Sequence, residues 1–569
     1  MFNPLCNRFM IDQKKLDTVI EKYRNEREEF YYRIYSGKIF DKGSDWLDFI
    51  SIIDGLFSEI AFGKRIIPFK RIFENHFTRI WRKENNVGDK IIHKYRQYLQ
   101  PSLVSEVRES LTSTKSSYER KYLNHLLIFL IEANSTFNIR DKNIQPPKGD
   151  KSFIKIDGKE IYVGDVDIRI QKEPNREKRE KMENTVKPII VERKKMFTKI
   201  QESYFETLSR SGYGNSLNLL MDTVNVDYFA LKTLAEDLSS RTQSLYKSML
   251  DKRLEKLKIP VSGLTDNDLR FASMGNEFDE FFKKDLLVPT LKSTLEGVWI
   301  DKKDIKIIED GKTFSQDLIS KLHQKKQKNI ILDLEYRPQK EIRAICISPK
   351  IPEKTYLVVK PFGGLFSYLS VKHEMGHALH AVNTDPSLPS VLKLGGDYSV
   401  TEAYAFLFEF LCFNPEWVKE FTPLKNNPNN FIEFSKFNKM LLMRNMITRF
   451  LVEFDIESRK TTENAEDIYS QAYEKVLSVT PYNYRWFMHL DSYAGHGKYL
   501  MSLILEAQLE EYLQQNFEGL KWYKNKGAVN FIKNLLSFGC MYTAEEIGRF
   551  MGYDGLDVKP LLRSLEGYS

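Results

Sequence analysis

The sequence predicts a mainly α-helical fold that carries one small β-sheet. Apolar residues recur at helical spacing over most of the chain, and proline and glycine are sparse in those stretches. Runs rich in isoleucine, valine and tyrosine gather between residues 329 and 362, where they indicate strands. A helical stretch with two histidines, His373 and His377, follows directly. We therefore expect a helical body in which a short sheet lies beside a histidine-bearing helix.

The bulk composition is that of a folded globular protein with ordinary charge. Of 569 residues, 42% are hydrophobic and 29% are charged, and the net charge of +8 is scattered along the chain. We therefore expect no nucleic acid partner, and the absence of any run of 18 apolar residues predicts no membrane span. Four widely spaced cysteines and no secretory signal at the N-terminus favour reduced thiols, a cytoplasmic location and, by default, a monomer.

The order of elements suggests two regions. Apolar residues at helical spacing continue from about residue 13 to 133, and a break follows at "NIQPPKGDKS", 143–152. We therefore expect an N-terminal helical region, 1–142, and a larger helical domain, 150–569. Asp157-Gly158 lies between two short alternating runs and predicts a tight hairpin. Helix formers then continue to about residue 324, the predicted sheet follows, and helices resume to the end of the chain.

The stretch "SVKHEMGHALHAV", 370–382, contains the pattern H-E-x-x-H. On a helix, His373 and His377 project from one face about one turn apart, so both imidazoles can reach one ion. Glu374 lies at the edge of that face, where it can act on a metal-bound water without being a ligand. The alternative is a helix that carries two histidines by coincidence.

A third ligand is expected from "GGDYSVTEAYAFLFEFLC", 395–412. Its very apolar helix contains Glu402 and Glu409, and a carboxylate in such surroundings is costly to bury unless it is paired or binds a metal. The two glutamates are seven residues apart and share a face. We assign Glu402 to the metal and Glu409 to a hydrogen bond with a ligand imidazole. The alternative for Glu409 is an exposed charge at the helix edge.

These residues resemble the zinc peptidases of the thimet oligopeptidase and oligoendopeptidase F family. Members combine H-E-x-G-H with a glutamate 25 residues after the second histidine, which is the separation of His377 and Glu402. Gly376, the following "ALH" and a glutamate seven positions beyond the third ligand also match. A segment of the form Asp-x-x-x-Arg-Pro-x-Lys matches at Asp333, Arg337, Pro338 and Lys340. The resemblance covers about residues 150–565 and marks a divergent member.

The resemblance implies a large helical, two-lobed body split by a deep substrate channel, with one Zn²⁺ on its floor and a short sheet along one wall. A narrow channel would admit short unfolded peptides and exclude folded proteins. The N-terminal region resembles the family least, and we expect it to form a lid over the channel or a partner-binding module. The strand near Ala344 to Ser348 is expected to pair with the peptide backbone as an added strand.

Members of the family also carry a late His/Tyr segment that closes over the substrate. The matching stretch here is "RWFMHLDSYAGHGKYLMSLI", with His489, Tyr493, His496 and Tyr499 as candidate donors to the oxyanion of the tetrahedral intermediate. Its spacing is shorter than in thimet oligopeptidase, and His496 stands where a tyrosine is expected. "GHGK" is expected to be a flexible loop. The alternative for His489 is a histidine whose hydrogen bonds are satisfied in the core.

The resulting hypothesis is a zinc metalloendopeptidase in which Glu374 takes the proton of a zinc-bound water and passes it to the leaving amine. One alternative is a dipeptidyl carboxypeptidase resembling angiotensin-converting enzyme, whose third ligand comes one residue earlier. The other is a catalytically idle helical binding protein that keeps zinc as a structural pin, although such a protein has no use for Glu374.

Overall fold

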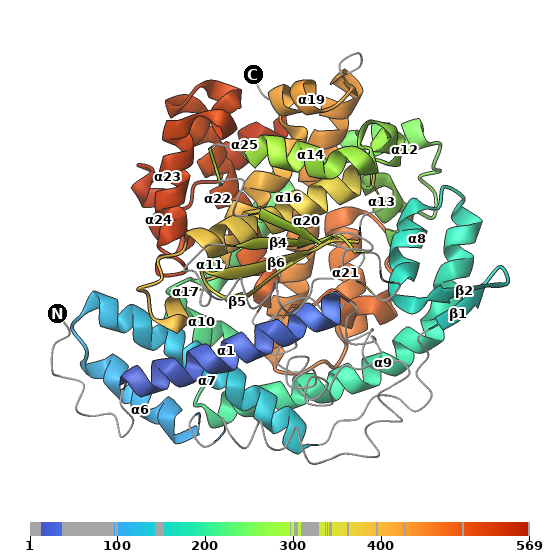
Figure 1. The fold of residues 1–569 in the computed structure, drawn as a ribbon. Coiled ribbons are helices and arrows are strands. Elements are labelled where there is room, and N and C mark those ends of the chain that lie inside the picture. The colour runs from blue at the N-terminus through green and yellow to red at the C-terminus, as the bar shows by residue number, and fades with distance from the viewer. Residues whose placement is uncertain are drawn as a thin grey trace.

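The helical body carries two small sheets. In Figure 1 the larger sheet lies near the centre of the view, and the smaller one projects at the right edge. The computed structural model describes residues 13–36, 96, 99, 101–142, 153–295, 298–300, 305–308, 329–335, 337, 340, 344–360, 363–393, 397–424, 428–491 and 494–566. The mainly helical fold class predicted from the sequence is confirmed. Within the described residues, no helix has both the length and the apolar character that crossing a membrane requires.

The helices fall into an N-terminal set, a middle set and a C-terminal set around the sheet. The α-helices are α1 (Gln13–Tyr35), α6 (Pro101–Ser113), α7 (Ser117–Asp141), α8 (Val166–Lys172), α9 (Arg176–Arg210), α10 (Ser216–Val224), α11 (Tyr228–Arg241), α12 (Gln243–Leu257), α13 (Asp266–Ser273), α14 (Lys284–Leu295), α16 (Leu365–Asn383), α17 (Ser390–Lys393), α18 (Ser399–Glu409), α19 (Pro415–Phe421), α20 (Pro428–Arg459), α21 (Ala465–Leu477), α22 (Gly495–Asn516), α23 (Lys526–Ser537), α24 (Ala544–Phe550) and α25 (Lys559–Glu566). Short 3₁₀ segments are η3 (Val163–Asp165), η4 (Asn276–Phe281), η6 (Phe410–Phe413), η8 (Asn483–Met488) and η10 (Gly519–Lys524).

The predicted hairpin at Asp157-Gly158 is confirmed. Strands β1 (Phe153–Ile156) and β2 (Lys159–Tyr162) pair antiparallel, with Ile156 opposite Lys159. Asp157 and Gly158 both have positive φ, 50° and 77°, which a two-residue turn of this kind requires and which aspartate and glycine tolerate.

The sheet predicted between residues 329 and 362 is also confirmed, as β4 (Ile330–Asp333), β5 (Ile345–Lys350) and β6 (Lys354–Val358). The strand order is β3-β4-β6-β5, with β3, β4 and β6 parallel and β5 antiparallel at one edge. Strand β3 (Ile305–Ile308) was not predicted, because it falls in a stretch assigned to helix. Its four residues, "IKII", are too few for apolar periodicity to distinguish strand from helix.

Four layers position the histidine helix. The sheet packs on α16, α16 packs on α18, and α18 packs in turn on α22. Alternate residues of the sheet, Leu332 and Leu357 among them, belong to the same buried cluster as the apolar residues of α16. Because a strand presents every second side chain to one face, this pattern identifies the face that supports α16.

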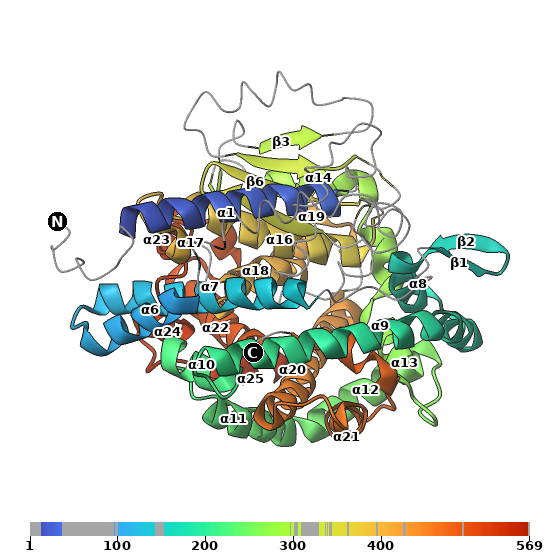
Figure 2. The same ribbon diagram turned by 90° about the horizontal axis from the view of Figure 1, so that it is seen from below.

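Helix α1 runs along the sheet beside β5, as both views show (Figures 1 and 2). The Tyr32 ring stacks on the Tyr356 ring of β6 with centroids 3.5 Å apart. At the end of the helix, Arg337 donates a hydrogen bond of 2.7 Å to the carbonyl of Ser36. A cation at a helix C-terminus is favourable, because unpaired carbonyls and the helix dipole make that end negative.

The matching family segment at Asp333 forms a buried ion cluster beneath this contact. Arg337 lies 3.2 Å from Asp333, and Lys340 lies 2.8 Å from it, with Asp333 and Lys340 fully buried. Tyr32 adds a hydrogen bond of 3.2 Å from its hydroxyl to the same carboxylate. The segment therefore joins the sheet to α1, and Pro338 lies outside the described residues.

Candidate metal centre and adjoining cavity

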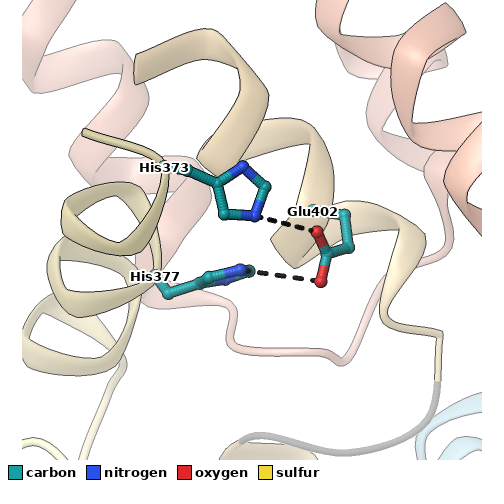
Figure 3. Close-up of side chains that lie close together, drawn as sticks. All are labelled: His373, His377 and Glu402. Atoms are coloured by element: carbon teal, nitrogen blue, oxygen red, sulfur yellow. Dashed lines mark ion pairs between the residues drawn. The ribbon is translucent and has the colours of Figure 1, made fainter. Parts of the chain in front are cut away.

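Three side chains from two neighbouring helices meet at one point (Figure 3). His373 and His377 project from α16, and Glu402 faces them from the first turn of α18. His373 Nε2 lies 3.3 Å from one oxygen of Glu402, and His377 Nε2 lies 3.5 Å from the other. One ligand atom from each residue can be chosen so that all three lie within 4.8 Å of one another. The three residues predicted as ligands are thus brought together.

The donor set fits a zinc ion. Two imidazole nitrogens and one carboxylate oxygen are common zinc ligands, and three protein ligands leave one position for water or substrate. His373 Nε2 is buried and makes no hydrogen bond within the described part of the chain, as expected of an atom that binds a metal. Burial lowers the pKa of His373, but the neighbouring carboxylates of Glu402 and Glu409 outweigh it and raise the pKa to about 10. This preference for a positive charge indicates that the site favours a cation.

The other nitrogen of each ligand imidazole is held by a hydrogen bond. His373 Nδ1 lies 2.8 Å from Glu409 Oε2, so Glu409 takes the position predicted for it. His377 Nδ1 lies 3.0 Å from the hydroxyl of Thr401, which was not predicted. The same hydroxyl lies 3.0 Å from Nδ1 of buried His380, whose Nε2 faces the carbonyl of Gly539. These contacts set the ring orientations and tautomers.

Gly376 allows the two helices to approach closely. A β-carbon at this position would lie 2.6 Å from Cα of Ala405 and 2.8 Å from the carbonyl oxygen of Tyr404, both in α18. Such distances are too short for any side chain, so the backbones themselves are in contact. The glycine in H-E-x-G-H therefore has a packing role in this protein, because it brings α18 within reach of the histidines.

Glu374 is anchored by the edge strand of the sheet. Its Oε2 accepts a hydrogen bond of 2.9 Å from the backbone N–H of Cys346, and the side chain lines the cavity beside the ligands. The N–H of Ala344 is likewise bonded to the hydroxyl of Ser370, at 3.0 Å. A peptide strand that paired at Ala344 to Ser348, as expected from the resemblance, would have to compete for both donors.

A cavity of about 370 Å³ adjoins His373, and its size is typical of small-ligand sites. Its walls come from α8, α13, α16, α18, α20, η8 and α22, and it contains His373, Glu374 and Glu409. His489, His496 and Tyr499 line it as well, so three predicted members of the His/Tyr segment lie in the same cavity as Glu374. None of the described residues between 13 and 142 lines it.

His489 is fully engaged in the cavity wall. Its Nε2 lies 2.6 Å from Nη2 of Arg270, and its Nδ1 lies 2.5 Å and 3.1 Å from the hydroxyls of Tyr469 and Tyr473. Burial, followed by the charges of Arg449 and Arg270, holds the pKa of His489 well below its usual range. A guanidinium only donates, so Nε2 must accept. His489 is therefore a poor candidate for an oxyanion donor, and the alternative of a satisfied histidine describes it better.

His496 is held by a buried carboxylate from α20. Glu453 accepts hydrogen bonds from the backbone N–H of Asp491 at 2.5 Å and of His496 at 2.9 Å, and also contacts His496 Nδ1.

The prediction that "GHGK" is a flexible loop was wrong, because Gly495 to Lys498 form the first turn of α22. The glycines are required by packing, since a β-carbon on Gly497 would lie 2.9 Å from the Phe450 ring.

Tyr499 lies one turn further along α22, with 9% of its surface exposed and its ring 5.7 Å from that of His496. These two residues are the remaining candidates for the oxyanion donor, because Tyr493 lies outside the described residues.

Four residues of the site and cavity wall were not predicted from the sequence: Thr401, Arg270, Arg449 and Glu453. For Thr401 a signal existed, since it immediately precedes the predicted ligand.

The sequence matches no protein-family model and no curated protein. Solved structures, in contrast, match along almost the whole chain. A protein assigned as oligoendopeptidase F matches with a TM-score of 0.61 at 10% identity, over 98% of this chain and 96% of that one. PZ peptidase A with an inhibitor matches with a TM-score of 0.59 at 11% identity, over 98% of this chain and 97% of that one. A protein from Bacillus anthracis that is assigned as oligoendopeptidase F matches with a TM-score of 0.56 at 12% identity, over 98% of this chain and 96% of that one. The chain therefore has the fold of these peptidases, as the resemblance implied.

Proposed function

We propose that the protein is a zinc-dependent oligopeptidase that cleaves short unfolded peptides as a monomer. The observation that carries the proposal is the position of Glu374. It lines one cavity together with His373, which forms a cluster with His377 and Glu402, and its carboxylate is held by the N–H of Cys346. A purely structural metal site needs no such base. The shared fold with solved peptidases supports the reaction class.

His373, His377 and Glu402 would hold the ion, and Glu409 and Thr401 would keep the two imidazoles turned toward it. When bound, zinc supplies a Lewis acid that acidifies water and polarises the scissile carbonyl. Glu374 accepts a proton from the attacking water and returns it to the leaving amine. Tyr499 Oη or the His496 imidazole donates a hydrogen bond to the developing oxyanion.

The decisive experiment measures zinc content and cleavage of a quenched fluorescent peptide by the wild type and by Glu374→Gln. Glutamine keeps the size and the acceptor for Cys346 but cannot take a proton. We expect unchanged zinc content and a loss of kcat of about 100-fold or more. Full activity in a variant that keeps its zinc would reject the mechanism. Glu402→Gln is the matched comparison, because it removes a ligand and should lower zinc content as well.

Tyr499→Phe tests the oxyanion donor separately. Removing one such donor lowers kcat by about 100-fold or more, with little effect on KM, because the bond forms only in the transition state. An unchanged kcat would leave His496 as the candidate.

Peptides with a blocked C-terminus distinguish an endopeptidase from a dipeptidyl carboxypeptidase, which would not cleave them. Mass spectrometry of the products gives the answer.

A further inference from the structure

One face of α20 forms part of the cavity wall. The residues that line the cavity recur every three or four positions, as expected for one side of a helix: Asn438, Leu441, Leu442, Asn445, Met446 and Arg449. Arg449 is at the end of this stripe, about 16 Å from its start by helix rise. It lies near His489, whose pKa it helps to lower. A positive charge is thus built into the same cavity as Glu374.

Arg449 has no partner for that charge. Within the described part of the chain, it makes no hydrogen bond or ion pair, and its Nε is buried without an acceptor. The other arginine of the cavity wall, Arg270, is paired with Asp266 at 2.7 Å and bonded to His489. Leaving a partly buried guanidinium without an acceptor is unfavourable, so such groups are normally paired.

The carboxylate that follows Arg449 on the same helix already has other partners. Glu453 follows Arg449 by one helical turn, but its oxygens accept from the N–H groups of Asp491 and His496 and contact His496 Nδ1. No ion pair joins Glu453 to Arg449 among the described residues, although the charge of Arg449 acts on Glu453 at a distance. The arginine therefore retains its capacity to bind a carboxylate from outside the chain.

We propose that Arg449 binds a carboxylate of the peptide substrate and makes the protein selective for peptides that present one in this cavity. The proposal rests on the proposed function, since it concerns the peptide cleaved beside Glu374. A guanidinium offers a planar fork that binds a carboxylate through two parallel hydrogen bonds, which neither a backbone amide nor a neutral side chain can match. The carboxylate is either the C-terminus of the peptide or an aspartate or glutamate side chain.

The test measures binding in the zinc-loaded Glu374→Gln protein, in which the peptide is not consumed. The ligands are N-acetylated octapeptides that carry a neutral fluorophore. One peptide has a free C-terminus and no acidic residue, and a second has an amidated C-terminus and no acidic residue. A third set keeps the amidated C-terminus and places one glutamate at each position in turn. Fluorescence anisotropy gives each Kd. We expect one carboxylate-bearing form to bind about 10- to 100-fold more tightly than the peptide without carboxylates.

Arg449→Gln should abolish this preference while leaving the affinity for the uncharged peptide unchanged. Arg459→Gln on the same helix is the matched control, because Arg459 is 53% exposed at the helix end and should leave every Kd unaltered. A preference for the free C-terminus assigns Arg449 to the peptide end, and a preference for one glutamate position assigns it to a side-chain subsite.

Equal affinity for all forms on the protein that keeps Arg449 would overturn the proposal, and that comparison does not require the Arg449 variant to fold. A carboxylate preference that survives in a folded Arg449→Gln protein would also overturn it. Failure of the proposed function looks different: the native protein would cleave no peptide, yet the carboxylate preference in binding would remain.

Discussion

Replacing Glu409 by glutamine tests how far the metal site depends on the carboxylate behind His373. The two groups lie 2.8 Å apart, and the Glu409 side chain is only 17% exposed, so solvent screens this contact weakly. Glutamine keeps the shape and an acceptor oxygen but removes the charge. A charge-assisted hydrogen bond contributes about 1.5–3 kcal/mol against about 1 kcal/mol for a neutral one. The difference of about 0.5–2 kcal/mol corresponds to zinc binding about 2- to 30-fold weaker.

The assay is a competition for zinc between the protein and a fluorescent chelator, with circular dichroism to verify that the variant is folded. Glu420→Gln is the matched control, because Glu420 pairs with Lys524 at the surface and does not line the cavity. It should bind zinc as the wild type does. If Glu409→Gln also matched the wild type, the carboxylate would not be what orients His373, and the reasoning would be refuted.

Three further predictions concern the surroundings of the site. Glu453→Gln should lower kcat for peptide cleavage about 10- to 100-fold with little change in KM, because it loosens His496; steady-state kinetics would measure the split. Burial lowers the pKa of His380 to about 4, so the unfolded chain takes up this proton near pH 6.5 and the folded chain only near pH 4. The free energy of unfolding should therefore fall by about 3 kcal/mol as pH drops through that window, and urea titrations should show a flatter pH dependence for His380→Gln. Removing zinc should lower Tm in thermal scans, since zinc at 100 times its Kd stabilises the folded state by about 2.7 kcal/mol.

The clustering of the three candidate ligands was predictable because its chemistry is local in sequence. Histidines four residues apart on a helix must share a face, and the apolar surroundings of Glu402 and Glu409 left few roles for a carboxylate. The sequence alone therefore predicts that both glutamates lie beside the histidines. Strand β3 and the first turn of α22 were missed or misassigned, because short apolar runs and glycine pairs are ambiguous until packing selects one conformation.

The part of the cavity wall that α20 contributes could not be predicted, as three arginines on this helix illustrate. Arg444 is fully buried and bonded to the carbonyls of Ser239 and Val476, Arg449 lines the cavity, and Arg459 is exposed. Nothing in the adjacent sequence separates these outcomes. They depend on which helices pack against each turn of α20, and that arrangement is a property of the whole fold.

The backbone contact at Gly376 bears on how the proposed zinc ion would be taken up. Because α16 touches α18 without intervening side chains, the separation of the histidines from Glu402 is set when the chain folds. The conformational entropy of gathering three ligands is then lost during folding and not again during metal uptake. Small zinc domains, in contrast, fold only as the ion binds. Here zinc should enter and leave a preorganised site, so its removal and return should proceed without refolding.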